Sequence, residues 1–172
     1  ARVEKRKGHE FILNSLLEIK EKFPKVLYLI AGKGPYLENI KKITKELNLE
    51  DHVKFLGWIT EPDKSLILKL SDLFVMTPTT VGESVEGFGM AYIDASFHGV
   101  ASIGSDSGGV SDAILDNKTG IICESGNQKM ITEKILHLLE NKKLRESMGA
   151  NGKLRAKENY AWDKKIIEYL DA

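Results

Sequence analysis

Apolar residues along the chain alternate between two kinds of spacing. Some segments repeat apolar positions every three or four residues, as in the set Ile12, Leu16, Ile19 and Phe23, which is typical of an amphipathic helix. Between these segments stand short continuous apolar runs such as 26–31, which suit strands buried on both faces. The pattern predicts helices at 9–23, 37–47, 63–70, 90–98, 110–115, 128–140, 143–158 and 161–170, and strands at 26–31, 53–56, 73–76, 100–103 and 120–123.

Strands and helices that alternate in this way are connected by right-handed crossovers, which give a parallel sheet with helices on both faces. We therefore expect an α/β fold, a doubly wound parallel sheet, in which residues 1–172 form a single domain. The chain opens on a loop, residues 1–8, where such a domain has its first strand. We expect that this first strand is missing from the chain and belongs to a longer polypeptide.

The composition narrows the classes of partner. The 172 residues are 42% hydrophobic and carry 25 Lys and Arg against 25 Asp and Glu. A net charge of zero argues against nucleic acid as a partner, because binding to phosphates relies on a basic surface. The single Cys123 forms no disulfide within the chain, and no apolar stretch approaches the roughly 20 residues of a transmembrane helix. We therefore expect a cytoplasmic protein.

Candidate chemistry lies in the loops after the strands, where doubly wound sheets bind their ligands. Residues 2–8 form a basic loop before a helix N-terminus, which suits an anionic group, although a solvated charged loop has the same sequence character. The Gly-Lys-Gly-Pro run at 32–35 is followed by Leu37 where a dinucleotide fingerprint needs a third glycine, so a tight turn is favoured. A Gly-rich loop at 105–110 offers further amides to an anion.

The most informative loop is 82–89. Gly87 and Gly89 allow a ligand to approach the backbone and leave amides at a helix N-terminus. Glu86 and Asp94 are eight positions apart, close to two helical turns, so we expect the carboxylates on one face about 12 Å apart. That separation is too long for a glycosidase pair or one metal ion and suits a polyhydroxyl ligand held at both ends. From spacing alone, an N-cap followed by an exposed aspartate is an equal alternative.

Several motifs stand in a fixed order along the chain. They are Arg2…Lys7-Gly8, Ala31-Gly32-Lys33-Gly34-Pro35, Phe55-Leu56-Gly57, Glu86-Gly87-Phe88-Gly89…Asp94-Ala95 and Gly108-Gly109. In this order and spacing they resemble the Rossmann-like donor-binding half of GT-B glycosyltransferases, with the retaining family 4 enzymes as the closest group. The likeness covers nearly the whole chain. The central motif is also similar to phosphatidylinositol mannosyltransferases and related GDP-mannose users.

The resemblance implies roles for the residues that match the family's motifs. In that family, the basic residues of the first loop hold the donor diphosphate, which implies this role for Arg2 and Lys7. The first acidic residue of the central motif contacts the transferred sugar and the second binds the nucleotide ribose. Here these residues are Glu86, the implied catalytic residue, and Asp94. The amides between them belong to the donor-binding residues Gly87, Phe88 and Gly89.

The resemblance also implies a base pocket, and the sequence differs from the family's motifs at two positions. In the family the base pocket lies just after the Phe-Leu-Gly strand, which points to Trp58 and Ile59. Asp94 stands where the family usually has Glu, so its ribose contact is expected to be longer, water-mediated or absent. Asp112 replaces the Glu that commonly follows the Gly-Gly pair, which weakens any role for that position.

The resemblance also implies an activity for the full-length protein. It is the retaining transfer of a hexose from a nucleoside-diphosphate sugar to a glycan or lipid acceptor, with GDP-mannose as the favoured donor. Neither a metal nor a cofactor is required if Arg2, Lys7 and the amides near Gly87 stabilise the leaving diphosphate. The acceptor, and any peripheral contact with the inner face of the membrane, belong to an N-terminal domain that the chain lacks. We expect the isolated chain to bind a nucleoside diphosphate without transferring sugar.

Two other classes stay open at this point. A non-catalytic sugar-nucleotide binding or epimerase domain uses the same scaffold. A Rossmann-type oxidoreductase is disfavoured by the incomplete glycine fingerprint at 32–37. The histidines, His9, His52, His98 and His137, form no recognisable constellation, and we expect them to be loop or surface residues.

Overall fold

The computed structural model of the protein describes residues 1–161, so the helix expected at 161–170 lies outside the described residues apart from its first position. The other expected helices and strands are present, with ends that differ by no more than two residues. In chain order they are the 3-10 turn η1 (Lys5–Lys7), α1 (His9–Lys22), β1 (Tyr28–Ala31), α2 (Leu37–Glu46), β2 (Val53–Gly57), α3 (Glu61–Leu70), β3 (Phe74–Val75), α4 (Met90–Phe97), β4 (Ser102–Ser105), α5 (Val110–Ala113), β5 (Gly120–Cys123), α6 (Gln128–Glu140) and α7 (Lys142–Asn159).

Local sequence explains where several helices begin and end. α1 buries Ile12 and Ile19 along one face and ends before Pro24, whose ring cannot continue the helix. The side chain of Thr60 accepts a hydrogen bond from an amide in the first turn of α3, and Asn127 does the same for α6. These N-caps satisfy amides that have no partner within the helix.

The strands pair in parallel, as expected, but they form two sheets rather than one continuous sheet. β1 pairs with β2, with Tyr28 opposite Val53. β4 lies between β3 and β5, with Ser102 opposite Phe74 on one side and Gly120 on the other. Among the described residues no strand joins β1 to β3, so the expected parallel α/β architecture is present as a pair of parallel sheets.

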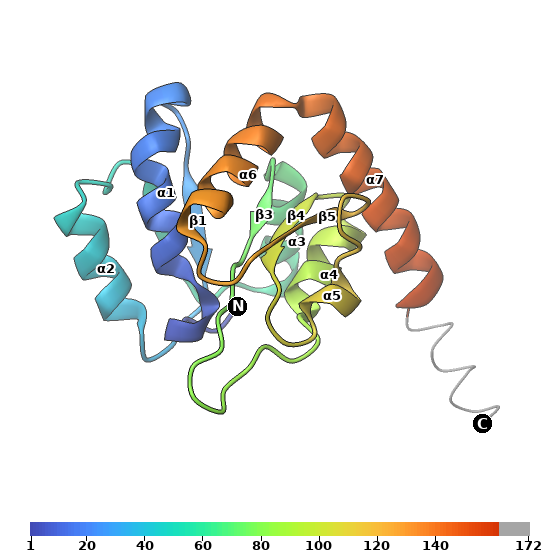
Figure 1. Ribbon diagram of the computed structural model, residues 1–172, viewed down its shortest axis with the longest axis horizontal. Helices are drawn as coiled ribbons and strands as arrows, with labels where there is room; N and C mark the ends of the chain where they lie inside the picture. The colour runs from blue at the N-terminus through green and yellow to red at the C-terminus, as the bar shows by residue number, and fades with distance from the viewer. Residues whose placement is uncertain (162–172) are drawn as a thin grey trace.

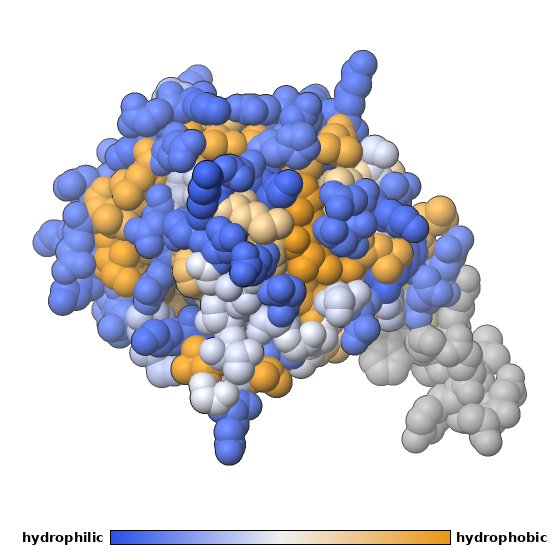
Figure 2. Space-filling model, in the orientation of Figure 1, coloured by the Kyte–Doolittle hydropathy of each residue, from blue (hydrophilic) through white to orange (hydrophobic). Residues whose placement is uncertain are grey.

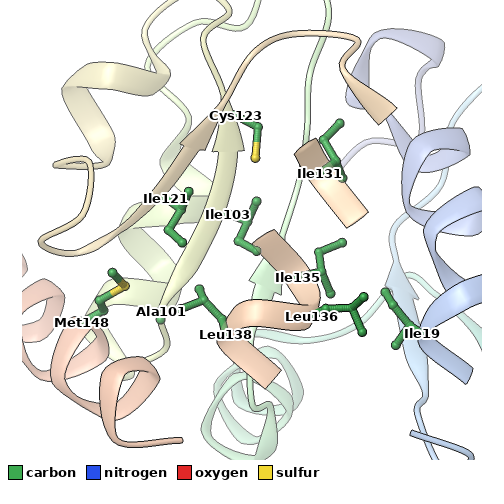
Figure 3. Close-up of a cluster of buried hydrophobic side chains, with 10 residues drawn as sticks. All are labelled: Ile19, Ala101, Ile103, Ile121, Cys123, Ile131, Ile135, Leu136, Leu138 and Met148. Carbon is green, nitrogen blue, oxygen red and sulfur yellow. The ribbon is translucent and has the colours of Figure 1, made fainter. Parts of the chain in front are cut away.

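Helices cover both faces of the three-stranded sheet (Figure 1). On one face, α1 and α6 bury a cluster with β4 and β5 that includes Ile19, Ile103 and Ile135 (Figure 3). On the other face, α4 and α5 bury Tyr92 and Val110 in a second cluster. β4 is buried along its whole length. With both faces covered, the loops at the carboxyl ends of the strands are left to form a site.

The N-terminal segment lies between the ends of β1 and β3. The Ala1 amine donates a hydrogen bond to the carbonyl of Ala31 over 2.8 Å, and the Val3 amide donates to the carbonyl of Lys33 over 2.9 Å. Further along, the carbonyl of Arg6 accepts from the amide of Thr79 over 2.7 Å. This segment therefore brings η1 to the carboxyl edge of both sheets. None of the helices within residues 1–161 is long and apolar enough to span a membrane.

Candidate functional site

Three segments meet at the carboxyl ends of the strands. They are η1, the loop 82–89 after β3 and the loop 105–110 after β4. Within the loop 82–89 only Glu86 and Gly89 are buried. Figure 2 shows hydrophobic surface near the lower end of the molecule, where the segment after β3 projects. In the loop 82–89, Val85 is 51% exposed. The loop thus turns one acidic side chain inward and leaves its tip outside.

Glu86 is the buried acid of this edge. Its side chain is 8% exposed, and its Oε2 accepts hydrogen bonds from Arg6 Nη1 and Lys7 Nζ, each over 2.6 Å. Burial alone would raise the pKa of Glu86, but hydrogen bonds and charges from Lys7 and Arg6 outweigh it, so the pKa lies below its ordinary value. The carboxylate is therefore ionised at neutral pH and is held by two cations.

A chain of ion pairs runs from Glu86 back to the start of the sequence. Arg6 Nε lies 3.0 Å from Glu4 Oε2, and Arg2 Nε lies 3.2 Å from Glu4 Oε1. The Arg2 side chain is 72% exposed, so the structure leaves it outside the buried cluster that contains Lys7. Arg6, which sequence reasoning missed, occupies the place beside Glu86. In the sequence, the only indication of this role for Arg6 was the basic character of residues 2–8.

The loop 105–110 supports the backbone of Glu86. The Gly109 amide donates to the carbonyls of Glu86 over 3.2 Å and Gly87 over 2.9 Å. Gly108 has φ +60°, and a Cβ there would overlap the Glu86 carbonyl. The expectation that this loop offers its amides to an anion is thus corrected at Gly109, whose amide is already bonded within the protein.

The loop 82–89 ends where α4 begins. Gly89 is the residue before α4 and has φ +78°, a left-handed conformation that favours glycine, and Met90 is the first helical residue. Glu86 therefore precedes the helix, and the expectation that Glu86 and Asp94 share one helix face is wrong. The reason is that the helical repeat starts only after the left-handed residue.

Asp94 turns toward α3 instead. Its Oδ2 lies 2.9 Å from Lys64 Nζ, and Lys64 also contacts Glu61 Oε2 at 2.8 Å. The Asp94 side chain is 36% exposed. The two acidic residues of the central motif thus face different cations on different elements.

The other predicted donor residues lie in different loops of the same edge. Trp58 follows β2 and is 79% exposed, and Ile59 beside it is half-buried. Gly87 is exposed, and Phe88 packs on Tyr160 with 5.5 Å between ring centroids. The structure therefore places the residues predicted for the base after β2 and those predicted for the sugar after β3.

This fold and its ordered loop residues correspond to a known family. The family described as "Glycosyl transferases group 1" matches residues 1–155. The chain belongs to the group 1 glycosyltransferases. Its expected α/β architecture, that of one half of a GT-B glycosyltransferase, is confirmed by the structures that it resembles.

Individual relatives of the chain agree with its assignment to this family. A GDP-mannose-dependent α-(1-6)-phosphatidylinositol monomannoside mannosyltransferase of Mycolicibacterium smegmatis is 31% identical over 164 residues, which cover 94% of this chain and 43% of the relative. A point mutant of TarM from S. aureus, in complex with fondaparinux, α-GlcNAc-glycerol and UDP, matches with a TM-score of 0.85 and 25% identity over 99% of this chain and 34% of TarM. The C-terminal domain of LpcC from Francisella tularensis has a TM-score of 0.81 and 22% identity, with 94% of this chain and 83% of that one covered. This chain thus spans less than half the length of the mannosyltransferase.

His9 is not the loop or surface residue that we expected. It is the first residue of α1, and its Nδ1 lies 2.7 Å from the hydroxyl of Tyr28. Burial, together with the charges of the Ala1 amine and Lys7, lowers the pKa of His9 to about 4. The imidazole is therefore neutral at physiological pH and acts here as a structural hydrogen-bonding group.

The positive charge at this edge of the sheets comes from the side chains of Arg6 and Lys7. Within residues 1–161, no group of three or more His, Cys, Asp or Glu side chains is placed to hold a metal ion. Beside Glu86, the protein presents the guanidinium of Arg6 and the ammonium of Lys7. An arrangement of one carboxylate and two cations can accept hydrogen bonds from hydroxyl groups and attract phosphate oxygens at the same place.

Proposed function

We propose that this chain is the donor-binding domain of a retaining glycosyltransferase that transfers a hexose from a nucleoside-diphosphate sugar to a glycan or lipid acceptor. The observation that carries the proposal is the buried Glu86, held by Arg6 and Lys7 at 2.6 Å. A donor of this class brings a polyhydroxyl sugar and a diphosphate to one point. It therefore requires a hydrogen-bond acceptor beside a group of cations, and the family supports that use of the site.

Glu86 is the residue that we propose for the transferred sugar. Its Oε2 takes both ion pairs, and no described residue donates to its Oε1, which keeps its capacity to accept from a sugar hydroxyl. The lowered pKa keeps the carboxylate ionised, and ionised acceptors make stronger hydrogen bonds than neutral ones. Arg6 and Lys7 fix its orientation through the other oxygen.

Lys7 and Arg2 are the residues that we propose for the diphosphate. Breaking the bond between the anomeric carbon and the diphosphate leaves negative charge on phosphate oxygen, and interactions that strengthen with that charge accelerate the reaction. The cations Arg2, Arg6 and Lys7 outnumber the carboxylates Glu4 and Glu86 in the ion-pair chain. The excess positive charge is available to the diphosphate, so the proposed mechanism uses no metal ion and no cofactor.

Backbone amides add to this proposal. Gly87, Phe88 and Gly89, which we propose to bind the donor, directly precede α4, and within the described chain no side chain caps the N-terminus of that helix. A helix N-terminus favours an anion through its unsatisfied amides and its dipole. We propose that these amides contact the diphosphate together with Lys7.

Asp94, Trp58 and Ile59 are the residues that we propose for the nucleoside. A ribose hydroxyl that binds Asp94 has to share or displace the ion pair with Lys64, whose side chain is 31% exposed. The 79% exposed Trp58 offers an aromatic face to a base. Guanine is the favoured base, because the relative at 31% identity is a GDP-mannose-dependent enzyme, whereas TarM at 25% identity was crystallised with UDP.

We also propose that a further strand of the same polypeptide lies between β1 and β3. These strands belong to separate parallel sheets, and the segment that begins with Ala1 already bonds to Ala31 at the end of β1. A strand in this place would join the two sheets into one. An N-terminal domain of that polypeptide would bind the acceptor and make any peripheral contact with the inner membrane face from the cytoplasm.

A transfer assay with the full-length protein tests the proposed function. We expect transfer from GDP-mannose with retention of the anomeric configuration, no loss of rate on addition of EDTA, and a large loss of rate in Glu86→Gln. We expect the isolated chain to bind a nucleoside diphosphate and to transfer nothing. Binding without transfer by the full-length protein would instead indicate a sugar-nucleotide binding protein, and tight binding of NAD would indicate an oxidoreductase.

A further inference from the structure

The end of α7 reaches the loop that carries Glu86, although the two are far apart in sequence. Tyr160 directly follows α7, and its ring packs against Phe88 with 5.5 Å between ring centroids. The guanidinium of Arg155 on α7 lies 5.1 Å from the centroid of the Tyr160 ring and donates to its hydroxyl over 2.8 Å. Figure 1 shows α7 running beside α4 and α5.

The same two side chains hold the C-terminal end of α5. Arg155 Nη1 donates to the carbonyl of Ala113 over 2.7 Å, and its Nη2 donates to the carbonyl of Asp112 over 2.6 Å. The Tyr160 hydroxyl donates to the same Asp112 carbonyl over 3.2 Å. α5 has only four residues, so it cannot satisfy these carbonyls within the helix. α7 therefore supplies the C-terminal hydrogen bonds of α5.

The N-terminal end of α5 supports the backbone of the loop 82–89. Gly109 precedes the helix and bonds to the carbonyls of Glu86 and Gly87, while Gly108 packs directly on the Glu86 carbonyl. Arg155 thus acts on Glu86 and Gly87 through α5. Tyr160 acts on the next residue of the loop through its ring, so both contacts converge on consecutive loop residues.

We propose that Arg155 and Tyr160 are positioning residues that fix the loop 82–89 in its donor-binding conformation, an inference that rests on the function proposed for that loop. The loop needs outside support because most of its residues, Val85 among them, are exposed. Fixing a loop before its ligand arrives increases affinity, because less conformational freedom is lost on binding. Substitution of either residue is therefore expected to weaken donor binding without removing a contact to the donor.

The attachment of α7 to the domain does not depend on these two side chains. Met148 on α7 is 3% exposed and belongs to the core cluster of Figure 3. Gly149 packs so closely on the carbonyl of Gly99 that a Cβ would overlap it. A variant at Met148 therefore serves as a control that disturbs the same helix at a place remote from the loop.

The test uses this chain and measures two quantities. They are the Kd for GDP and UDP by calorimetry and the amide hydrogen exchange of residues 86–89. Tyr160→Leu removes the ring contact and the hydroxyl, and we expect Kd to rise by about fivefold or more, with faster exchange at 86–89. Arg155→Gln removes the bonds to the α5 carbonyls and is expected to act in the same direction. Tyr160→Phe keeps the ring on Phe88, and we expect its Kd to stay within about twofold of the parent.

Met148→Ala distinguishes positioning from stability. We expect it to lower Tm and, well below Tm, to leave Kd and the exchange at 86–89 unchanged. Equal effects of Tyr160→Leu, Arg155→Gln and Met148→Ala on these two quantities would overturn the inference. If the parent binds neither GDP nor UDP, the proposed function fails. The exchange then decides by itself: faster exchange at 86–89 in Tyr160→Leu or Arg155→Gln than in Met148→Ala supports the positioning role, and equal exchange overturns it.

Discussion

Glu86 and Asp94, the two carboxylates of the central motif, lie in contrasting surroundings. The Glu86 side chain is 8% exposed and accepts from two cations, Arg6 and Lys7. The Asp94 side chain is 36% exposed and shares Lys64 with another carboxylate. The elements that face them cause the difference, because η1 turns two cations inward while α3 presents one cation near the surface.

The comparison teaches which contact is fixed before a ligand binds. Charges in a poorly solvated place interact strongly and are costly to separate, whereas exposed pairs are screened and contribute little. Glu86 is therefore held in one geometry by Arg6 and Lys7, and Asp94 can exchange partners at low cost. On the proposed function, this suits a residue that orients the sugar and a residue that adapts to the nucleoside.

The largest expected effect is on the stability of Glu86→Ala. Removal of this carboxylate leaves Arg6 and Lys7 partly buried without their partner. We expect a loss of about 2–4 kcal/mol in the free energy of unfolding, toward the lower end of the range for a broken buried ion pair because Arg6 is 17% exposed. Urea unfolding at pH 7.5 measures it. A loss below about 1 kcal/mol would place Glu86 in the same class as an exposed ion pair.

A second effect is expected on the pH dependence of stability, through the buried imidazole of His9. The pKa of His9 falls to about 4 in the folded protein, against about 6.5 in the unfolded chain, so between these values the unfolded state binds more protons. The stability that comes from the neutral imidazole of His9 is therefore fully present above pH 6.5 and is lost progressively as the pH falls toward 4. We expect a loss of about 2 kcal/mol between pH 7.5 and pH 5 in the parent that is absent in His9→Gln.

The exposed His137 provides the matched control for this measurement. His137→Gln should keep the pH dependence of the parent, since its ring lies outside the buried edge. Equal losses in the free energy of unfolding for His9→Gln and the parent over this pH range would contradict the proposed role of His9 in the pH dependence.

The smallest effect on stability is expected for Asp94→Ala. Its ion pair with Lys64 is partly solvated, so its loss should cost less than about 1 kcal/mol of the free energy of unfolding. The Asp94→Ala variant should lose, in its binding free energy for a nucleoside diphosphate, no more than the contribution of one charge-assisted hydrogen bond. The loss should be smaller if Asp94 reaches the ribose through water. Calorimetry on the same sample checks this. A stability loss as large as that of Glu86→Ala would remove the contrast between the two carboxylates.

Most of the fold could be predicted because it depends on local patterns. Most strands fall within short apolar runs, and the helices repeat at helical spacing, so both kinds of element were identifiable. The split into two sheets was not, since pairing between β1 and β3 depends on what lies between them. The shared helix face failed because α4 begins at Met90, as its apolar pattern predicts, so Glu86 lies before the helix and does not follow its repeat.

The candidate site was predictable in part. Lys7 and Glu86 matched motifs, and the structure brings them together. Arg6 was missed because a basic loop does not reveal which side chains turn inward. Only the fold of η1 buries Lys7, half-buries Arg6 and leaves Lys5 exposed. The buried environment of His9 likewise depends on Tyr28, a contact made through tertiary structure.

The central claim, that the cation cluster beside Glu86 binds a diphosphate, is tested most directly by titrating GDP and UDP into this chain and two variants. Lys7→Gln removes the buried ammonium, and Lys5→Gln removes the same charge from the exposed position of η1. A lost charge-assisted hydrogen bond of about 1.5–3 kcal/mol predicts that Lys7→Gln weakens binding by roughly 10–150-fold. Lys5→Gln should stay within about threefold of the parent, as expected for a screened surface charge. If the folded Lys7→Gln variant binds as tightly as the parent, the claim is contradicted.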